Sequence, residues 1–210
     1  MSAEIVLYTH PMSRGRIARW MLEETGVEYD VEILEYAESM KSPEYLKVNP
    51  MGKVPAIRHG ETVVTEAAAI CAYLADAFPG AGLAPPTNAR GAYYRWLFFA
   101  AGPLEAATFN HRLGFKVPIE QEQAAGYGTL KAVVDTLETA LSAGPFVAGK
   151  SFSAADVYFG SHIGWGMEML RTIEPRPVFE EYWARVSDRP AHVRSKTEDD
   201  NLAATLRSNA

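Results

Sequence analysis

The sequence predicts a small α/β domain followed by an all-helical domain. Strand and helix signals alternate over the first eighty residues, and a stretch rich in glycine and proline, "GAGLAPPTN", follows them. Beyond that stretch, hydrophobic residues recur only at helical spacing. A chain of 210 residues is long enough for one sizeable core or two small ones. We therefore place the two domains at residues 1–80 and 88–205.

The first domain is predicted to run in the order β-α-β-α-β-β-α. Its opening strand is "EIVLY", and the next helix, "SRGRIARWMLEETG", has Ile17, Trp20 and Met21 on one face and stops at Gly26. Then come "VEYDVEIL", which alternates as a half-buried strand does, and "SPEYLKVNP", a short helical turn closed by proline. Two short strands about a His-Gly turn, "VPAIRHGETVV", lead into the helix "EAAAICAYLADAF".

Beyond the linker the sequence predicts only helices. A helical run in "ARGAYYRWLFFAAGP" is expected before Gly102-Pro103, and the stretch that ends in "TLKAVVDTLETALSAG" is amphipathic. The stretch "FSAADVYFGSHIGWGMEMLRTI" is apolar nearly all round, which favours a central buried helix. A further helix, "PVFEEYWARVSDRP", ends at proline. The tail after Pro190 is polar, and we expect it to be poorly ordered.

The start of the apolar helix carries a sharp local signal. Ser153 and Asp156 fit a capping box in its aspartate variant, in which each residue accepts a hydrogen bond from the backbone N–H of the other. Phe152 and Val157 stand at the positions of a hydrophobic staple. We interpret this motif as structural, and removing such a cap typically costs ~1 kcal/mol.

Composition and charge exclude several classes of function. The chain is 48% hydrophobic and 22% charged, as globular proteins are, and its net charge of −6 argues against general affinity for nucleic acid or an anionic membrane. The N-terminus lacks the layout of a signal peptide, and no apolar run reaches membrane-spanning length. The histidines show no metal-ligand spacing and Cys71 is the only cysteine, so we expect no metal site and no intrachain disulfide. These features predict a soluble cytoplasmic protein.

Four stretches of the first domain contain candidate binding residues. In "NPMGKVPAI", Pro55 lacks a ladder donor and must lie at a strand edge or start. If the Val54-Pro55 bond is cis, the N–H and C=O of Val54 point outward and can pair with an extended peptide; a trans edge proline is the alternative. In "TEAAAICAYL", Glu66 lies at a helix N-terminus, which attracts a ligand carboxylate. The alternative is that Glu66 only favours the dipole of its own helix.

The other two stretches offer cations and hydroxyls. Lys53 and Lys41 are candidate partners for a ligand carboxylate, although lone lysines are usually solvated. Ser13 stands at the mouth of a basic helix, where it is either a helix cap or a reacting group. Tyr8, at the end of the first strand, is either an ordinary strand residue or a reacting group. Cys71 lies within a helix and is expected to be a buried, unreactive thiol.

The order and spacing of these pieces resemble the cytosolic glutathione transferases. The matching pieces are a strand followed by "PMSRGR" and a helix, then "NPMGKVPA", "TEAAAICAYLAD" and "GPFVAGKSFSAADV", which together span nearly the whole chain. The nearest pattern is the serine-using bacterial and theta-like branch, where a hydroxyl residue stands just before the first helix. The resemblance implies a thioredoxin-like α/β domain, a linker and an all-α domain, and it implies a homodimer.

The resemblance also gives the candidates roles in binding glutathione. The cysteinyl backbone of glutathione would pair with Val54 beside a cis-Pro55, and its glycyl carboxylate would face one of the two lysines. Its γ-glutamyl carboxylate would sit near Glu66 and Ala67 and accept backbone N–H groups. Relatives usually have serine or threonine where this chain has Ala67, so one side-chain hydrogen bond is missing, which lowers affinity by ~1 kcal/mol.

A hydroxyl at a helix N-terminus suits the activation of a bound thiol. A thiol with a pKa of ~8.5 is only a few per cent thiolate at neutral pH. The Ser13 hydroxyl can donate to sulfur while the helix dipole, Arg14 and Arg16 favour the anion. Other branches of the family place a catalytic tyrosine where Tyr8 stands. We therefore predict Ser13 as the activating residue, with Tyr8 as the alternative, and the sulfur of glutathione as the nucleophile.

The activity implied by the resemblance is thiolate attack on a small hydrophobic electrophile, or a related glutathione-dependent peroxidase or dehalogenase reaction. The electrophile's pocket is expected between the domains, lined by Met12, Phe109, His111 and Trp165. Further aromatic candidates are Tyr93, Trp96, Phe99 and Phe115. The alternative is a non-catalytic member of the same fold that binds glutathione, a hydrophobic ligand or a protein partner. Ala67 favours that alternative, whereas Ser13 and Pro55 favour the enzyme.

Overall fold

A computed structural model describes residues 4–208 of the chain. The described residues form two compact units. The first unit runs from the first described residue to Leu83 and also contains the chain from Asp188 onward, and the second unit, which we call the helical unit, spans Ala84–Ser187. The prediction of an α/β part followed by an all-helical part is confirmed.

The first unit is built on a four-stranded mixed sheet with strand order β2-β1-β3-β4. Strands β1 (Ile5–Thr9) and β2 (Tyr29–Ile33) are parallel and are joined through helix α1 (Gly15–Thr25). Strands β3 (Ala56–His59) and β4 (Thr62–Thr65) form the predicted hairpin, and β3 lies antiparallel to β1. This arrangement brings the end of β1 and the start of β3 to the same edge, since Tyr8 pairs with Ala56.

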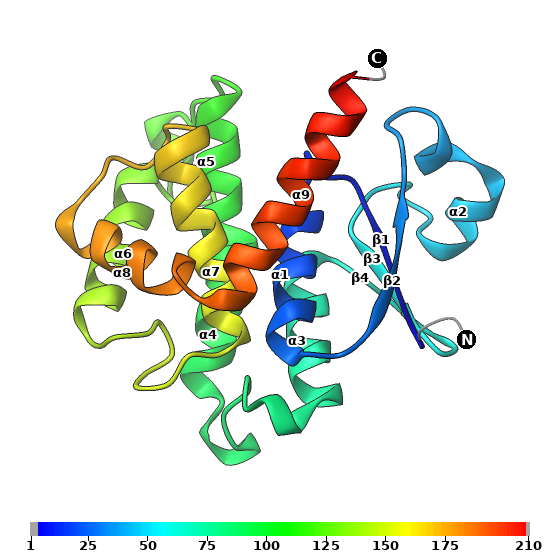
Figure 1. Cartoon of the computed structure of the whole chain (residues 1–210). Helices are drawn as coiled ribbons and strands as arrows, with labels where there is room; N and C mark the ends of the chain where they lie inside the picture. Colours follow the sequence, from blue (N-terminus) through cyan, green and yellow to red (C-terminus); the bar gives the residue numbers. More distant parts are fainter. Residues whose placement is uncertain (1–3, 209–210) are drawn as a thin grey trace. The chain divides into compact units, whose positions relative to one another are not determined.

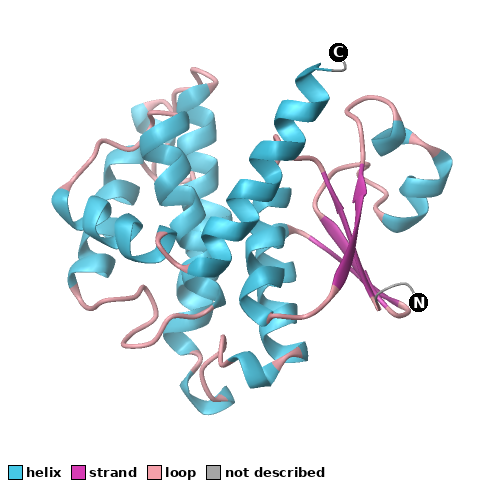
Figure 2. Ribbon diagram, viewed as in Figure 1, coloured by secondary structure: helices cyan, strands magenta, loops and turns pink. Residues whose placement is uncertain are grey.

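Helices cover both faces of this sheet. Helices α1 and α3 (Ala67–Ala77) lie on one face, and α2 (Pro43–Val48) lies on the other (Figure 1; Figure 2). On the α2 side, a small core forms around Tyr8, Tyr45 and Ala56. Alternate residues of β1, such as Leu7, point to the opposite face. Cys71 is fully buried in α3, as expected.

The expectation of a poorly ordered tail is wrong, because the chain after Pro190 forms the long helix α9 (Pro190–Ser208). It packs lengthwise against α1 (Figure 1). The side chains that α9 buries recur every fourth residue and are small or polar, namely Ala191, Ser195, Asp199 and Ala203. A stripe of that composition gives no hydrophobic periodicity, so the sequence carried no signal for this helix.

The helical unit contains five α-helices among its described residues: α4 (Gly91–Phe99), α5 (Glu105–Arg112), α6 (Leu130–Ser142), α7 (Ala154–Gly164) and α8 (Pro177–Ser187). All residues of α7 are buried, as predicted, and its capping box is present. The chain does not leave the helical path at Gly102-Pro103. A π-helical segment, Ala100–Leu104, takes up the proline and leads directly into α5.

Candidate functional site

The turn between β1 and α1 holds Ser13 through three hydrogen bonds. The carbonyl oxygen of His10 accepts both the Ser13 backbone N–H, at 3.0 Å, and the Ser13 hydroxyl, at 2.6 Å. The Ser13 Oγ in turn accepts the backbone N–H of Gly15, the first residue of α1, at 2.9 Å. Ser13 therefore lies at the mouth of α1, as predicted, with its proton directed to a backbone carbonyl.

Close packing at this helix start explains the glycine in "SRGR". A Cβ atom at Gly15 would collide with the hydroxyl of Thr9, which is fully buried at the end of β1. The Ser13 Oγ lies next to the same point. Only glycine lets the backbone of α1 approach the end of the strand this closely.

A second layer of side chains, missed by the sequence reasoning, covers the turn. The backbone N–H of Met12 donates to His10 Nδ1 at 3.1 Å, and the Tyr36 hydroxyl donates to the Met12 carbonyl at 3.2 Å. The rings of His10 and Tyr36 lie 4.5 Å apart between centroids. Burial raises the pKa of Tyr36, so its hydroxyl stays protonated and serves as a donor. Tyr36 follows β2 in the chain, and no local sequence signal indicates that it lies over Met12.

Tyr8 occupies a different environment from Ser13. Its side chain is 7% exposed, lies in the small core on the α2 side and packs 5.5 Å from the Tyr45 ring. Its hydroxyl accepts a hydrogen bond from Arg58 Nε at 3.4 Å. Each of the two candidate hydroxyls thus has its own set of protein partners.

The Val54-Pro55 peptide bond is cis, which decides between the two alternatives that the sequence left open. Strand β3 begins at Ala56, so Val54 lies just outside the ladder. Within residues 4–208, no hydrogen bond is found for the N–H or the C=O of Val54. Two side chains fix the preceding residue, because Tyr45 Oη and Asn49 Nδ2 donate to the Lys53 carbonyl at 2.6 and 2.8 Å.

The two candidate lysines differ in what they already bind. Lys41 Nζ donates to the carbonyls of Met51 and Gly52, both at 2.9 Å. Lys53 is exposed, and no hydrogen bond or ion pair of its ammonium group is found among the described residues. Lys53 is thus the more available cation for a ligand carboxylate.

Glu66 has an unusual backbone conformation at the start of α3. It is the N-cap residue, with φ 65° and ψ 117°, and its side chain makes no capping hydrogen bond. A non-glycine residue in such a region costs about 1–3 kcal/mol, and residues of this kind gather at ligand-binding sites. The buried Ala67 follows as the first helical residue. Because Glu66 does not cap the helix, its side chain does not occupy the first N–H groups of α3. An anion that binds a helix N-terminus needs such N–H groups as donors.

Cys71 is no part of this site. Its thiol is fully buried, and burial raises its pKa far above the usual range. A cysteine in this state is neither nucleophilic nor accessible to an oxidant.

The predicted electrophile-binding residues differ in their exposure and in whether they line a pocket. Met12 and Phe109 are 54% and 41% exposed, His111 is exposed and Trp165 is half-buried. His111 lines a pocket of about 260 Å³ in the helical unit, together with Phe115 and Tyr127. Phe109 and Trp165 do not line that pocket. Of the further aromatic candidates, Tyr93 and Trp96 belong to the buried core.

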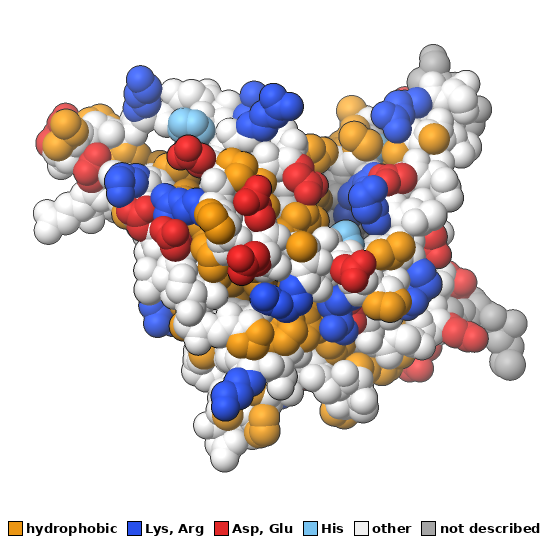
Figure 3. Space-filling view, turned by 60° about the vertical axis from the view of Figure 1, so that its left-hand side comes forward, with side chains coloured by type: hydrophobic (Ala, Val, Ile, Leu, Met, Phe, Trp, Pro, Cys, Tyr) orange, Lys and Arg blue, Asp and Glu red, His pale blue; other side chains and the backbone are white. Residues whose placement is uncertain are grey.

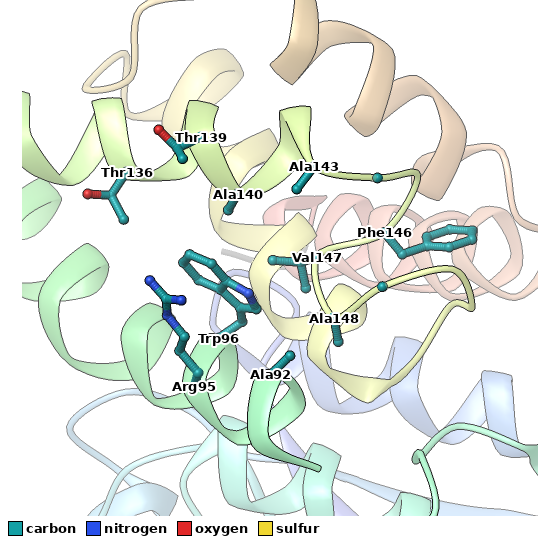
Figure 4. A pocket seen from close by; sticks show the side chains of 12 residues that line it. Ala92, Arg95, Trp96, Thr136, Thr139, Ala140, Ala143, Phe146, Val147 and Ala148 are labelled. Atoms are coloured by element: carbon teal, nitrogen blue, oxygen red, sulfur yellow. The ribbon is translucent and has the colours of Figure 1, made fainter. Parts of the chain in front are cut away.

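A second pocket in the helical unit, of about 340 Å³, lies between α4, α6 and the turn after α6 (Figure 4). Arg95 and Trp96 line it from α4, and Thr136 and Thr139 line it from α6 (Figure 4). The Arg95 guanidinium lies over the Trp96 ring, 4.5 Å from its centroid. This pocket was not predicted from the sequence, and its lining is mostly apolar.

Neither the face drawn in Figure 3 nor the arrangement of His, Cys, Asp and Glu side chains within residues 4–208 indicates a further site. Acidic and basic side chains are intermixed on the face drawn in Figure 3. Between residues 4 and 208, no three His, Cys, Asp or Glu side chains come together as metal ligands would. None of the helices in that range has the length and apolar composition needed to cross a bilayer.

Comparison with known proteins identifies the family. Residues 3–76 match the glutathione S-transferase N-terminal domain, and residues 120–185 match the C-terminal domain. A curated relative, the disulfide-bond oxidoreductase YghU of Escherichia coli strain K12, is 30% identical over 90% of this chain and 73% of its own length. The chain belongs to the glutathione S-transferase family.

Solved structures of the family support the same conclusion. The glutathione transferase of Methylococcus capsulatus str. Bath has a TM-score of 0.78 and 29% identity, covering 93% of this chain and 98% of its own. The theta class glutathione S-transferase of Xanthomonas axonopodis pv. citri, solved with glutathione bound, has a TM-score of 0.76 and 26% identity. That match covers 92% of this chain and 97% of the other. The family resemblance inferred from the motifs is confirmed.

Proposed function

We propose that this family member is a glutathione transferase that binds glutathione along the Val54-Pro55 edge and activates its thiol at Ser13. The observation that carries the proposal is the Ser13 hydroxyl, held at the mouth of α1 by His10 and Gly15. The backbone of Val54, without partners among the described residues, supplies the strand-like pairing that the cysteinyl part of glutathione needs. Glutathione is seen bound in a theta class structure that resembles this chain.

The other contacts follow from the groups that remain available. The γ-glutamyl carboxylate binds the N-terminus of α3 near Glu66 and Ala67 through backbone N–H groups. The glycyl carboxylate meets Lys53, or Lys41 if the latter shares its ammonium with the Met51 and Gly52 carbonyls. No side-chain hydroxyl assists at Ala67, which lowers the affinity for glutathione by ~1 kcal/mol.

The chemistry is a nucleophilic substitution by the sulfur of glutathione. The Ser13 hydroxyl turns from the His10 carbonyl to donate to the sulfur, while Ser13 Oγ keeps the hydrogen bond from Gly15. Each pKa unit by which the thiol is lowered corresponds to ~1.4 kcal/mol of preferential stabilisation of the thiolate. The thiol proton leaves to solvent, the sulfur forms a bond to the electrophilic carbon, and the leaving group departs with the bonding electrons.

Met12, Phe109, His111 and Trp165 are the residues that we propose to contact the electrophile. The homodimer remains a prediction from the family resemblance, and the cytoplasmic location remains a prediction from the composition and the N-terminal sequence. A second candidate reaction is reduction of a disulfide by glutathione, which the similarity to the E. coli disulfide-bond oxidoreductase favours. In that reaction the same thiolate attacks one disulfide sulfur instead of carbon, the S–S bond breaks and the other sulfur leaves as a thiolate, and a second glutathione resolves the mixed disulfide to oxidised glutathione.

Binding and thiolate absorbance test the proposal on wild type, Ser13→Ala and Tyr8→Phe. We expect wild type to bind glutathione and to lower the pKa of its thiol, and we expect Ser13→Ala to bind it without that shift. Retention of the shift in Ser13→Ala, with its loss in Tyr8→Phe, would transfer the role to Tyr8. Absence of glutathione binding would reject the enzyme and leave the non-catalytic alternative. Assays with an aryl halide and with a mixed disulfide then separate conjugation from disulfide reduction.

A further inference from the structure

We propose that His10 is a positioning residue for the Ser13 turn, and that only its neutral ring, protonated at Nε2, holds this turn in the form that binds glutathione. The inference about binding rests on the proposed function. The inference about the ring itself rests on the hydrogen bonds of the turn alone.

His10 contacts the turn from both its backbone and its side chain. Its carbonyl oxygen accepts the N–H and the hydroxyl of Ser13, and its Nδ1 accepts the N–H of Met12. The two residues that follow Pro11 are therefore both fixed by His10. The ring is 7% exposed and lies against the ring of Tyr36, which in turn donates to the Met12 carbonyl. The ring thus positions Met12 directly, while the backbone of the same residue positions Ser13.

The Met12 hydrogen bond specifies the protonation state of the ring. A backbone N–H can donate to Nδ1 only if that nitrogen carries a lone pair. In a neutral imidazole the proton is then on Nε2, the nitrogen that lies 3.7 Å from Glu35 Oε2. A proton added at Nδ1 would point at the Met12 N–H, and the hydrogen bond between Met12 and His10 would be lost.

The charged and titratable groups around the turn set the direction of the effect. Glu35 and Tyr36 face the ring from the segment after β2, and the Glu35 carboxylate lies 3.7 Å from Nε2. Arg14 and Arg16 stand at the start of α1, with Arg16 Nε donating to the Pro11 carbonyl at 2.5 Å. A proton on Nδ1 would add a further positive charge beside Arg14 and the N-terminus of α1, whereas Arg16 is paired with Asp200 at 2.7 Å. Acidification should therefore displace Met12 and Ser13 and weaken glutathione binding.

Two substitutions separate the role of His10 as a hydrogen-bond acceptor from its ability to take up a proton. In His10→Asn, the Oδ1 atom occupies about the place of Nδ1 and accepts the Met12 N–H, but it does not titrate. In His10→Phe, the ring against Tyr36 is kept and the acceptor is lost. His59→Asn is the matched control, because His59 is the last residue of β3 and pairs with Ile5, at the opposite end of β1 from His10.

The first measurement uses the free protein and needs no glutathione. Nitrogen-15 NMR of the ring should show the Nε2–H tautomer of His10 at about pH 8, and on acidification the Met12 amide signal should move together with the ring nitrogen signals. A ring protonated at Nδ1 at pH 8, or a Met12 amide that ignores the titration, would overturn the proposal whether or not the protein binds glutathione.

The second measurement is the pH dependence of S-methylglutathione binding by calorimetry, because this analogue has no thiol to titrate. Wild type and His59→Asn should lose affinity by about tenfold per pH unit once His10 becomes charged. His10→Asn should bind well with a flat profile, and His10→Phe should bind about two- to tenfold more weakly throughout. An acid-dependent loss that persists in His10→Asn would contradict the proposal. Failure of wild type to bind at pH 8 would reject the proposed function, leaving the NMR result to decide the role of the ring.

Discussion

Two buried aspartates, Asp156 in the helical unit and Asp199 in the first unit, are both fully buried but are satisfied in different ways. The carboxylate of Asp156 accepts four hydrogen bonds: from Val147 N–H at 2.8 Å, from Tyr182 Oη at 3.0 Å, and from the N–H and hydroxyl of Ser153, both at 3.0 Å. Asp199 instead has a charged partner, Arg19, whose Nε donates to Oδ1 at 3.0 Å.

The difference shows how a buried charge can be stabilised by dipoles or by a countercharge. Asp156 has all of its lone-pair positions occupied by neutral donors. Asp199 depends on one guanidinium, and within the described part of the chain its Oδ2 and the Nη2 of Arg19 have no hydrogen-bond partner. We therefore expect Asp199 to be the more vulnerable of the two to loss of a single neighbour.

Removal of Arg19 should have the largest effect. Arg19→Met leaves Asp199 buried without its cation, which costs about 3–5 kcal/mol for a broken buried pair. The free energy of unfolding in urea measures this loss. The double variant Arg19→Met/Asp199→Leu removes both charges and should recover most of the stability. Equal losses in the single and double variants would show that packing of α9 on α1, and not the ion pair, is responsible.

Asp156→Asn should have a smaller but substantial effect. The amide group faces at least one of the four donors with an N–H, and an unsatisfied buried group costs about 1–3 kcal/mol. The matched control is Asp135→Asn on α6, where an exposed carboxylate pairs with Lys131 and Arg176. Exposed pairs contribute little, so the control should unfold close to wild type in urea. A control as destabilised as Asp156→Asn would contradict the assignment of the effect to burial.

The same contrast shows what the sequence could and could not predict. The partnership of Ser153 with Asp156 spans three residues and follows a known motif, so it was predicted together with α7. Arg19 and Asp199 lie far apart in the chain, and the stripe of α9 that carries Asp199 is not hydrophobic. Helix α9 was therefore missed.

The candidate site divides in the same way. Ser13 at the start of α1 was predicted, because its position in the strand–turn–helix is local. The contact of Tyr36 with Met12 depends on the path of the chain after β2, and no local sequence pattern predicts it. His10 was considered only as a metal ligand, so the acceptor role of its Nδ1 was missed. The state of the Val54-Pro55 bond was left open, since local sequence alone does not distinguish an edge trans proline from a cis one.

The smallest expected effect is a difference in how the destabilisation by Asp156→Asn and the destabilisation by Asp135→Asn depend on pH. Burial raises the pKa of Asp156, whereas hydrogen bonds from Lys131 and Arg176 lower that of the exposed Asp135. A carboxyl whose pKa is raised on folding contributes stability below its unfolded value, and this contribution is lost as the pH rises through the folded pKa. A lowered pKa gives the opposite trend, since its contribution is present above the unfolded value and is lost as the pH falls.

Urea unfolding of wild type and both variants between about pH 4 and pH 7 measures these trends. The advantage of wild type over Asp156→Asn should shrink as the pH rises, because the native carboxylate must then ionise while buried. The advantage of wild type over Asp135→Asn should not shrink over the same range. An advantage over Asp156→Asn that grows with pH would mean that the four donors outweigh the desolvation of Asp156, and that neutral dipoles alone hold this buried charge more firmly than we infer.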